Sequence, residues 1–235
     1  MVTHTLRAFD SDLQKLAQNV AQMGRLVERQ VVDAMAALTG GDAALARHVL
    51  ESDDAIDILQ RGIEEEAVAT IACRQPMAID LREIVGAMRI AGDLERIGDL
   101  AGNIANESLM LGDGPRPVRV IRDLEPVTTL VIEQLRRVLD SYLRHNVEEA
   151  LAVWHNDAEV DALYSSLFAE ILGCIRQTPD AATPCIHLMF CAKNLERIGD
   201  HSTNIAEAVY YIVVGHIIRE TRPKADTTCQ GVPPL

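Results

Sequence analysis

Two identical acidic motifs in this sequence have a spacing that places two carboxylates on one face of a helix. The segment Leu94–Asp99, LERIGD, recurs unchanged as Leu195–Asp200, 101 residues later. Residues four apart lie on one face of a helix, so each copy presents a glutamate and an aspartate together. The two like charges disfavour the helix by a few tenths of a kcal/mol. Repetition of this unfavourable arrangement indicates that something compensates it.

A second acidic pair precedes each motif, at the same spacing of four. Antiparallel helices that turn at Pro76 and at Thr178-Pro179 would place each preceding pair level with its motif. Four carboxylates form a hard, all-oxygen donor set, which suits Mg²⁺, Mn²⁺, Ca²⁺ or iron. The sequence therefore predicts two sites, with ligands Asp53, Asp57, Glu95 and Asp99 in the first and Asp157, Asp161, Glu196 and Asp200 in the second.

Ordinary surface ion pairs are the alternative interpretation of these acids. Arg96 and Arg197 each precede the aspartate of their motif by three residues and could pair with it. His201 follows the second motif, but one helical step turns it about 100° away from the acidic face. Gly98 and Gly199, in mid-helix, each cost about 1 kcal/mol relative to alanine. They predict a close approach to the backbone at both motifs.

The elements that must position these acids are helices. Because proline breaks helix interiors, long proline-free stretches are where helices can form. Turns at Gly40-Gly41-Asp42 and near His145-Asn146 divide two of these stretches. An apolar stripe at steps of three and four supports the helical assignment. The prediction is six helices, over residues 5–38, 43–74, 78–111, 121–144, 148–176 and 185–219.

Short connections between such helices make neighbours antiparallel, so each group of three folds as an up-down-up bundle. We expect an all-α protein made of two tandem antiparallel three-helix bundles, related by internal duplication. The expected divisions are 1–112 for the first bundle, 118–220 for the second and 221–235 for a disordered, proline-containing tail. Asn103-Ile104-Ala105, repeated as Asn204-Ile205-Ala206, supports the duplication.

Composition excludes several classes of protein. The 235 residues carry 22 Lys and Arg against 35 Asp and Glu, a net charge of −13, so a nucleic-acid backbone would be repelled. Aromatic residues make up 3 %, which argues against stacking on single strands. The five cysteines include no CxxC pair and fit a reducing cytoplasm. The longest apolar run, 210–218, is shorter than the roughly 20 residues that span a bilayer.

The duplicated LERIGD segments, each in the third helix of a three-helix unit, resemble the PhoU family of bacterial phosphate-transport accessory and regulatory proteins. The resemblance extends over residues 3–220 and includes Arg74-Gln75-Pro76 and 188–192. It implies metal ions, including multinuclear iron or zinc clusters, on the eight acids named above; manganese or magnesium also suit them. The second-helix pairs read D-x-x-x-D, with Asp54 beside Asp53, and Asn194 stands where the first copy has Asp93, so we expect the two sites to differ in affinity or nuclearity.

The resemblance also implies a function. Such proteins are negative regulators of the phosphate-starvation response that link the phosphate ABC transporter ATPase to a membrane sensor histidine kinase. We therefore expect a cytoplasmic, non-enzymatic regulatory adaptor of phosphate uptake, forming a homodimer and meeting the membrane only through partner proteins. Two alternatives stay open. Carboxylate-bridged metals could serve a hydrolase or oxidase, or the chain could be a purely structural helical scaffold.

Overall fold

The computed structural model describes residues 2–112, 114 and 116–223. Within them the secondary structure is helical and includes no strand, which confirms the all-α prediction. The helices are α1 (Val2–Gly40), α2 (Ala43–Glu51), α3 (Asp53–Arg74), α4 (Ile79–Leu111), α5 (Val118–Arg144), α6 (Val147–His155), α7 (Asp157–Gln177) and α8 (Ala182–Val214), with a short 3-10 helix at Pro179–Ala181. None of the described helices is long and apolar enough to cross a membrane.

Two of the six predicted helices are each divided in two. The second breaks at Ser52, between α2 and α3, and the fifth breaks at Asn156, between α6 and α7. Asp53 and Asp157 are consequently the first residues of α3 and α7. A carboxylate is favoured there by the helix dipole. Periodicity could not reveal either break, because the apolar stripe continues across it.

Several predicted boundaries also shift by a few residues. Helix α8 starts at Ala182, with Pro184 in its first turn, where a missing N–H costs nothing. It ends at Val214 instead of 219, since Gly215 adopts the left-handed conformation with φ 89°. The predicted turns at 40–42 and 145–146 are confirmed. Asp42 accepts hydrogen bonds from the N–H groups of Ala44 and Leu45 at the start of α2.

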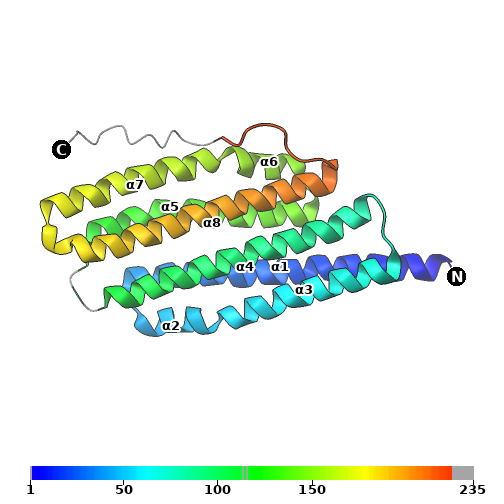
Figure 1. The fold of residues 1–235 in the computed structure, drawn as a ribbon, viewed down its shortest axis with the longest axis horizontal. Helices are drawn as coiled ribbons and strands as arrows, with labels where there is room; N and C mark the ends of the chain where they lie inside the picture. Colours follow the sequence, from blue (N-terminus) through cyan, green and yellow to red (C-terminus); the bar gives the residue numbers. More distant parts are fainter. Residues whose placement is uncertain (1, 113, 115, 224–235) are drawn as a thin grey trace.

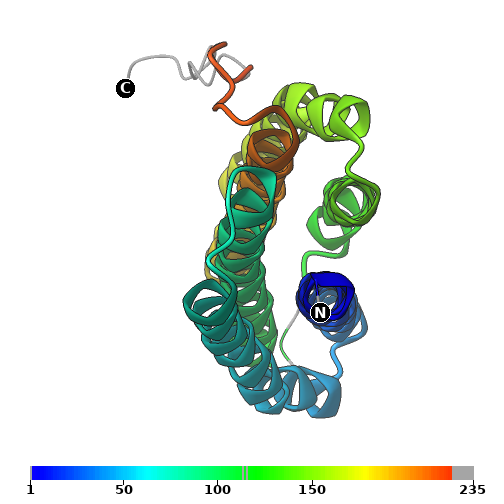
Figure 2. The same cartoon turned by 90° about the vertical axis from the view of Figure 1, so that its right-hand side faces the viewer.

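The helices form two units, each built on three long helices, that share one long interface. Helices α1, α3 and α4 pack together in the first unit, with α2 beside them, and α5, α7 and α8 pack together in the second, with α6. The most extensive helix–helix packing of all joins α4 to α8 (Figure 1). Seen end-on, α4 and α8 lie side by side in one layer, and α1 and α5 lie in another (Figure 2). The boundaries 1–112 and 118–220 stay a prediction.

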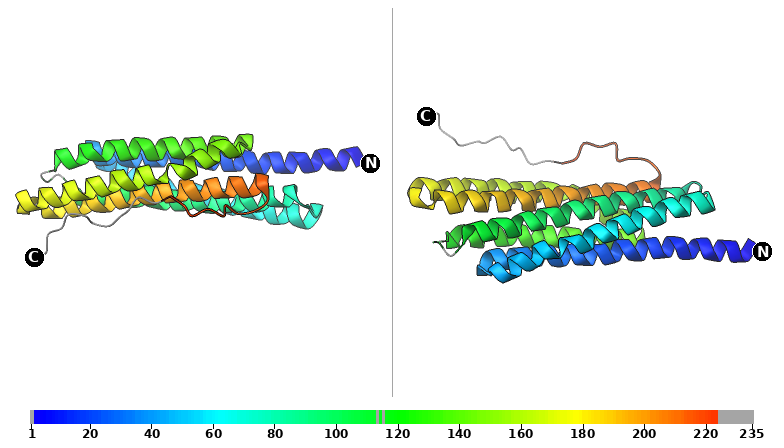
Figure 3. Two further views of the ribbon diagram at one scale, coloured as in Figure 1. Left: turned by 90° about the horizontal axis from the view of Figure 1, so that it is seen from above. Right: turned by 60° about the horizontal axis from the view of Figure 1, so that its bottom comes forward.

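The core is aliphatic, as the composition requires. The largest fully buried side chains include Met23, Leu94, Ile97 and Leu124, together with Trp154. Leu94 and Ile97 belong to the first motif, and their counterparts Leu195 and Ile198 are equally buried. The apolar residues of each motif therefore anchor α4 and α8 in the core. This anchoring fixes which way the acids of the motif face. The elongated arrangement of all the helices is visible from two further directions in Figure 3.

Candidate functional site

The first carboxylate cluster consists of Asp53, Asp57, Glu95 and Asp99. The first two lie at the start of α3 and the others in the middle of α4, and the negative charges of the other three act on Glu95. Burial raises the pKa of Asp53, and the negative charges of Asp99 and Asp57 raise it further, against a hydrogen bond from Gln30. Burial and the charge of Asp99 likewise raise the pKa of Glu95. The cluster is thus a concentration of uncompensated negative charge.

Arg96 compensates this cluster only weakly. Its Nη1 lies 3.3 Å from Asp99 Oδ2 and its Nε lies 3.5 Å from Glu95 Oε2. The arginine side chain is exposed. Exposed ion pairs typically contribute between 0 and about 1 kcal/mol. The surface ion-pair interpretation therefore describes a real contact here, but one that leaves most of the repulsion in place.

The second carboxylate cluster consists of Asp157, Asp161, Glu196 and Asp200, and it is more deeply buried. Asp157 is 2 % exposed, Asp161 6 % and Glu196 9 %. The second cluster also has strong cationic partners. Arg222 donates from Nε to Asp157 Oδ2 at 2.8 Å and from Nη2 to Asp157 Oδ1 at 2.6 Å. The same Nη2 lies 2.8 Å from Asp200 Oδ1.

Further donors complete the second cluster. Thr203 Oγ1 donates to Asp157 Oδ1 at 3.2 Å, and Lys193 Nζ donates to Glu196 Oε2 at 2.6 Å. A buried carboxylate needs such partners, because desolvation of an unpaired charge costs several kcal/mol. Burial alone would lower the pKa of Arg222, but the hydrogen bond and charge of Asp157 raise it. The guanidinium therefore stays charged between Asp157 and Asp200.

The docked position of Arg222 bears on the predicted disordered tail. Residues 224–235 of that tail lie outside the described part of the chain. Residues 221–223 lie within it, and there Arg222 is held by ion pairs instead of projecting into solvent. Composition alone suggested a solvated segment, because one arginine in a polar, proline-containing stretch has no pattern that marks it as buried.

The two motif glycines are sites of close approach, as predicted. A Cβ atom at Gly98 would lie 3.1 Å from Ile56 Cδ1 and 3.2 Å from Gln30 Oε1. At Gly199 it would lie 3.2 Å from Val160 Cγ1. The atoms that approach belong to the protein's own core. Each glycine allows the neighbouring helix that carries the second acidic pair to pack closely against its motif.

Two glutamines at corresponding positions of the repeat were not singled out from the sequence. Gln30 Nε2 donates to Ser52 Oγ at 3.0 Å and Gln134 Nε2 donates to Asn156 O at 3.2 Å, so both bind at a helix break. Both are buried, and their Oε1 atoms have no hydrogen-bond partner among the described residues. Their separation of 104 residues equals that of Asp53 and Asp157. This shared offset is the signal that could have identified them.

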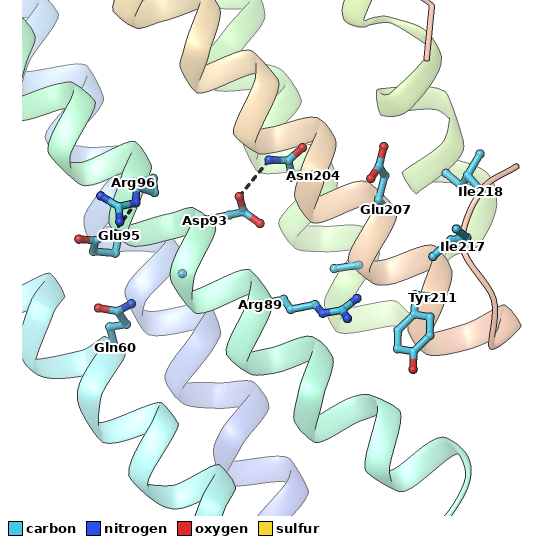
Figure 4. Close-up of a pocket in the computed structure, with 12 residues that line it drawn as sticks. Gln60, Arg89, Asp93, Glu95, Arg96, Asn204, Glu207, Tyr211, Ile217 and Ile218 are labelled. Carbon is cyan, nitrogen blue, oxygen red and sulfur yellow. Dashed lines mark hydrogen bonds and ion pairs between the residues drawn. The ribbon is translucent and has the colours of Figure 1, made fainter. Parts of the chain in front are cut away.

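An open groove of about 610 Å³ extends from the first cluster to the end of the second unit. Glu95, Arg96 and Asp93 line it from α4, and Asn204 and Tyr211 line it from α8 (Figure 4). Asn204 donates to Asp93 at 3.2 Å, and His201 Nδ1 lies 2.9 Å from the same carboxylate oxygen. Asp93 thereby links α4 to α8 through polar contacts.

Comparison with known proteins decides the family. The family model described as PhoU domain matches residues 20–108 and again 124–209, once in each unit. The chain belongs to the PhoU family. The duplication and the resemblance inferred from the LERIGD motifs are thereby confirmed. Each match ends within the motif-bearing helix, α4 or α8, of its unit.

PhoU relatives match almost end to end. A phosphate-specific transport system accessory protein PhoU homolog of Rhizobium meliloti is 46 % identical over 96 % of this chain and 95 % of its own length. A homolog of the same description from Caulobacter vibrioides is 41 % identical over 98 % and 100 %. The crystal structure of PhoU from Pseudomonas aeruginosa superposes with a TM-score of 0.85 at 36 % identity, covering 88 % of this chain and all of that one.

The phosphate transport system regulatory protein PhoU from Streptococcus pneumoniae is also similar, with a TM-score of 0.84 at 27 % identity over 90 % of this chain and all of that one. Such agreement at this identity shows that the helical arrangement tolerates extensive substitution.

The two clusters of this PhoU protein differ in how well they fit a metal ion. Nowhere in the described part of the chain do three or more acidic, histidine or cysteine side chains converge closely enough to hold one as they stand. In the first cluster the donors suit a hard cation, and the buried Gln30 Oε1 faces the helix that carries Glu95 and Asp99. Partly exposed carboxylates there can turn toward an ion. In the second cluster Arg222 already holds Asp157 and Asp200.

Proposed function

We propose that this protein is a non-enzymatic regulatory adaptor of phosphate uptake and signalling that binds metal ions through its acidic motifs. In this role it restrains the phosphate-starvation response by linking the phosphate ABC transporter ATPase to a sensor histidine kinase. It acts in the cytoplasm, as a homodimer, and reaches the membrane through these partners.

The observation that carries the proposal is the end-to-end match to phosphate-specific transport system accessory proteins, at up to 46 % identity over 96 % of the chain in the relatives described above. A match to one domain alone would show only that the two proteins share that domain. Here the PhoU domain model matches both units of the chain. The surface chemistry also agrees with a protein partner, since a net charge of −13 disfavours direct binding to anionic lipid or nucleic acid.

Metal binding is the part of the proposal that rests on the first cluster. Asp53, Asp57, Glu95 and Asp99 would be its ligands, and the ion would be iron, zinc, manganese or magnesium. A bound cation supplies the positive charge that Arg96 supplies only partly. Its binding would then join α3 to α4 through carboxylates of both helices. The metal would therefore stabilise the first unit in the form that partners recognise.

Metal content tests this part directly. We would measure it by mass spectrometry on protein purified without added metal or a nickel-affinity tag. The variant Glu95→Gln/Asp99→Asn removes two charges from the first cluster, and Glu51→Gln/Glu65→Gln removes two exposed acids of the same unit as a matched control. We expect metal in the parent and the control, and its loss in the cluster variant with helicity unchanged. Equal metal in all three would remove the first cluster from the proposal.

The adaptor role needs a separate measurement. Immobilised protein would be incubated with the transporter ATPase and with the kinase, at high and at low phosphate. We expect both to be retained, with an amount that depends on phosphate. If neither is retained at any phosphate concentration, the adaptor role is wrong, whatever the metal content.

A further inference from the structure

The chain beyond α8 turns back over the second unit as a strap, residues 215–223, which we call the C-terminal strap. Gly215 permits the turn, with φ 89°. Arg82 of α4 fixes the end of α8 by donating from Nε to Ile212 O at 3.1 Å. Figure 1 shows the strap leaving α8 and turning back beside α6. Its path is therefore set at the start by α4 as well as by α8.

Two side chains attach the strap to the body of the protein. Ile218 packs against the hydrophobic core. Four residues later, Arg222 enters the second cluster, where its side chain is only 18 % exposed and contacts Asp157 and Asp200. An apolar contact followed by a bidentate, buried ion pair gives the strap one defined position.

The first unit has no equivalent of this contact among the residues that the structure describes. The chain beyond α4 also carries an arginine, Arg116. Its Nη1 donates to Leu38 O at 2.8 Å and its Nη2 donates to Gly112 O at 3.0 Å. Arg116 thus binds carbonyl groups at helix ends, on α1 and after α4, instead of carboxylates. The duplicated architecture leaves the first cluster open and closes the second.

We propose that the C-terminal strap is an internal plug: Arg222 occupies the place of a metal cation in the second cluster, and a divalent metal binds Asp157 and Asp200 only after the strap has left. The proposal deepens the metal binding proposed above, on which it rests. A guanidinium and a metal ion cannot both bind the same carboxylate oxygens at contact distance. Strap docking and metal binding at this cluster therefore exclude one another, and each shifts the population of the other.

Release of the strap would also change the groove between the units. Ile217 and Ile218 of the strap form the end of the groove that begins at Glu95 (Figure 4). Departure of the strap removes this wall and exposes apolar surface of α8. Metal binding at the second cluster would therefore change the shape of the surface next to the first cluster. This coupling gives the plug a regulatory consequence.

The test counts bound Mn²⁺ on the full chain, after chelator treatment, by electron paramagnetic resonance during titration with manganese chloride. Arg222→Ala removes the plug. Arg219→Ala removes the same charge from an exposed position of the same strap and is the matched control. At Mn²⁺ concentrations too low to displace the strap, we expect Arg222→Ala to bind at least one more Mn²⁺ than the unmodified protein and Arg219→Ala to bind the same number as the unmodified protein. Addition of Asp200→Asn to Arg222→Ala should remove the extra ion.

Hydrogen exchange of the strap provides a second readout on the unmodified protein. Amides of residues 216–222 should exchange faster in Arg222→Ala than in Arg219→Ala without metal. In the unmodified protein, Mn²⁺ at the concentration that fills the second cluster should accelerate the same amides. This measurement keeps the test valid even if Arg222→Ala folds poorly.

The outcomes separate the two proposals. Equal Mn²⁺ binding by Arg222→Ala and the unmodified protein overturns the plug, as does Mn²⁺ binding at Asp157 and Asp200 with the strap still protected. Absence of Mn²⁺ from the unmodified protein overturns metal binding at the first cluster. If Arg222→Ala then binds Mn²⁺ at the second cluster, metal binding belongs to the second cluster alone and the plug is supported; if it binds none, both proposals are wrong.

Discussion

Asp157→Asn should destabilise this PhoU protein, and the size of the loss in unfolding free energy follows from the contacts of the Asp157 carboxylate. Asp157 is buried and accepts two charge-assisted hydrogen bonds from Arg222. Removal of one partner of a fully buried pair costs about 3–5 kcal/mol. The cost is smaller here because the strap can move away from the second cluster, so that water hydrates the Arg222 side chain. We therefore expect a loss of about 2–3 kcal/mol, near the value of one hydrogen bond to a charged group.

The assay is thermal unfolding followed by circular dichroism at pH 7, in the presence of a chelator. For a chain of 150–250 residues, each kcal/mol shifts the melting temperature by about 2–4 °C, so Asp157→Asn should lower it by roughly 4–12 °C. Asp140→Asn is the control, because Asp140 forms an exposed pair with Arg144 at 3.3 Å. An exposed substitution should change the stability by less than about 0.5 kcal/mol.

Asp53→Asn gives the contrast within the same repeat. It relieves repulsion in the first cluster, so without metal the free energy of unfolding should stay level or rise by a few tenths of a kcal/mol. The melting temperature should stay level or rise with it. The reasoning is wrong if Asp157→Asn melts within about 1 °C of Asp140→Asn. It is also wrong if Asp53→Asn and Asp157→Asn are equally destabilised, because the two clusters would then not differ in compensation.

Three further predictions follow from burial and packing. Burial and neighbouring charges raise the pKa of Asp53 in the folded state, so ionised Asp53 destabilises that state above the raised pKa, and protonation removes the destabilisation as the pH falls. The melting-temperature advantage of Asp53→Asn without metal should therefore shrink as the pH is lowered from 7. A constant difference would contradict this. Gly98→Ala should be less stable than Gly62→Ala by about 1–3 kcal/mol, since its Cβ meets Ile56 and Gln30 whereas nothing lies within 4 Å at Gly62; equal melting temperatures would refute the close approach. Burial raises the pKa of Cys185 to about 11, with Cys174 adding to it, and Cys73 is exposed, so iodoacetamide at pH 8 should label Cys73 well before Cys185 by peptide mass spectrometry, and labelling at similar rates would refute it.

Local patterns carried the prediction of the helices and of the motifs. The apolar stripe and the prolines gave helices close to α1 and α4, because burial of one helix face repeats with the helix period. They failed at Ser52 and Asn156. At those breaks Ser52 and Asn156 accept hydrogen bonds from Gln30 and Gln134, which lie in other helices. A hydrogen bond between two helices does not change the spacing of apolar residues, so a break at such a contact cannot be predicted from that spacing.

Spacing around Pro76 and Pro179 placed the acidic pairs of each hairpin level with one another, and the interaction of Asp53 with Asp99 agrees with that placement. The metal ligands themselves stay a prediction. In the sequence, a difference between the two sites is indicated by Asn194, which stands where the first copy has Asp93; the motif itself is repeated unchanged, so its spacing does not predict a difference in burial. The inequality arises from burial and from Arg222, both of which depend on the second unit as folded.

The sequence by itself determined the all-α class, the duplication and the position of each acidic motif in a buried helix, because these depend on residue type and local period. Only the tertiary structure decided which cation reaches which carboxylate. Arg222 lies 65 residues from Asp157, beyond the end of α8, and its position depends on the turn at Gly215 and the packing of Ile218. Two charged groups interact when they are close in space. In a folded chain that closeness cannot be predicted from how far apart they are in the sequence.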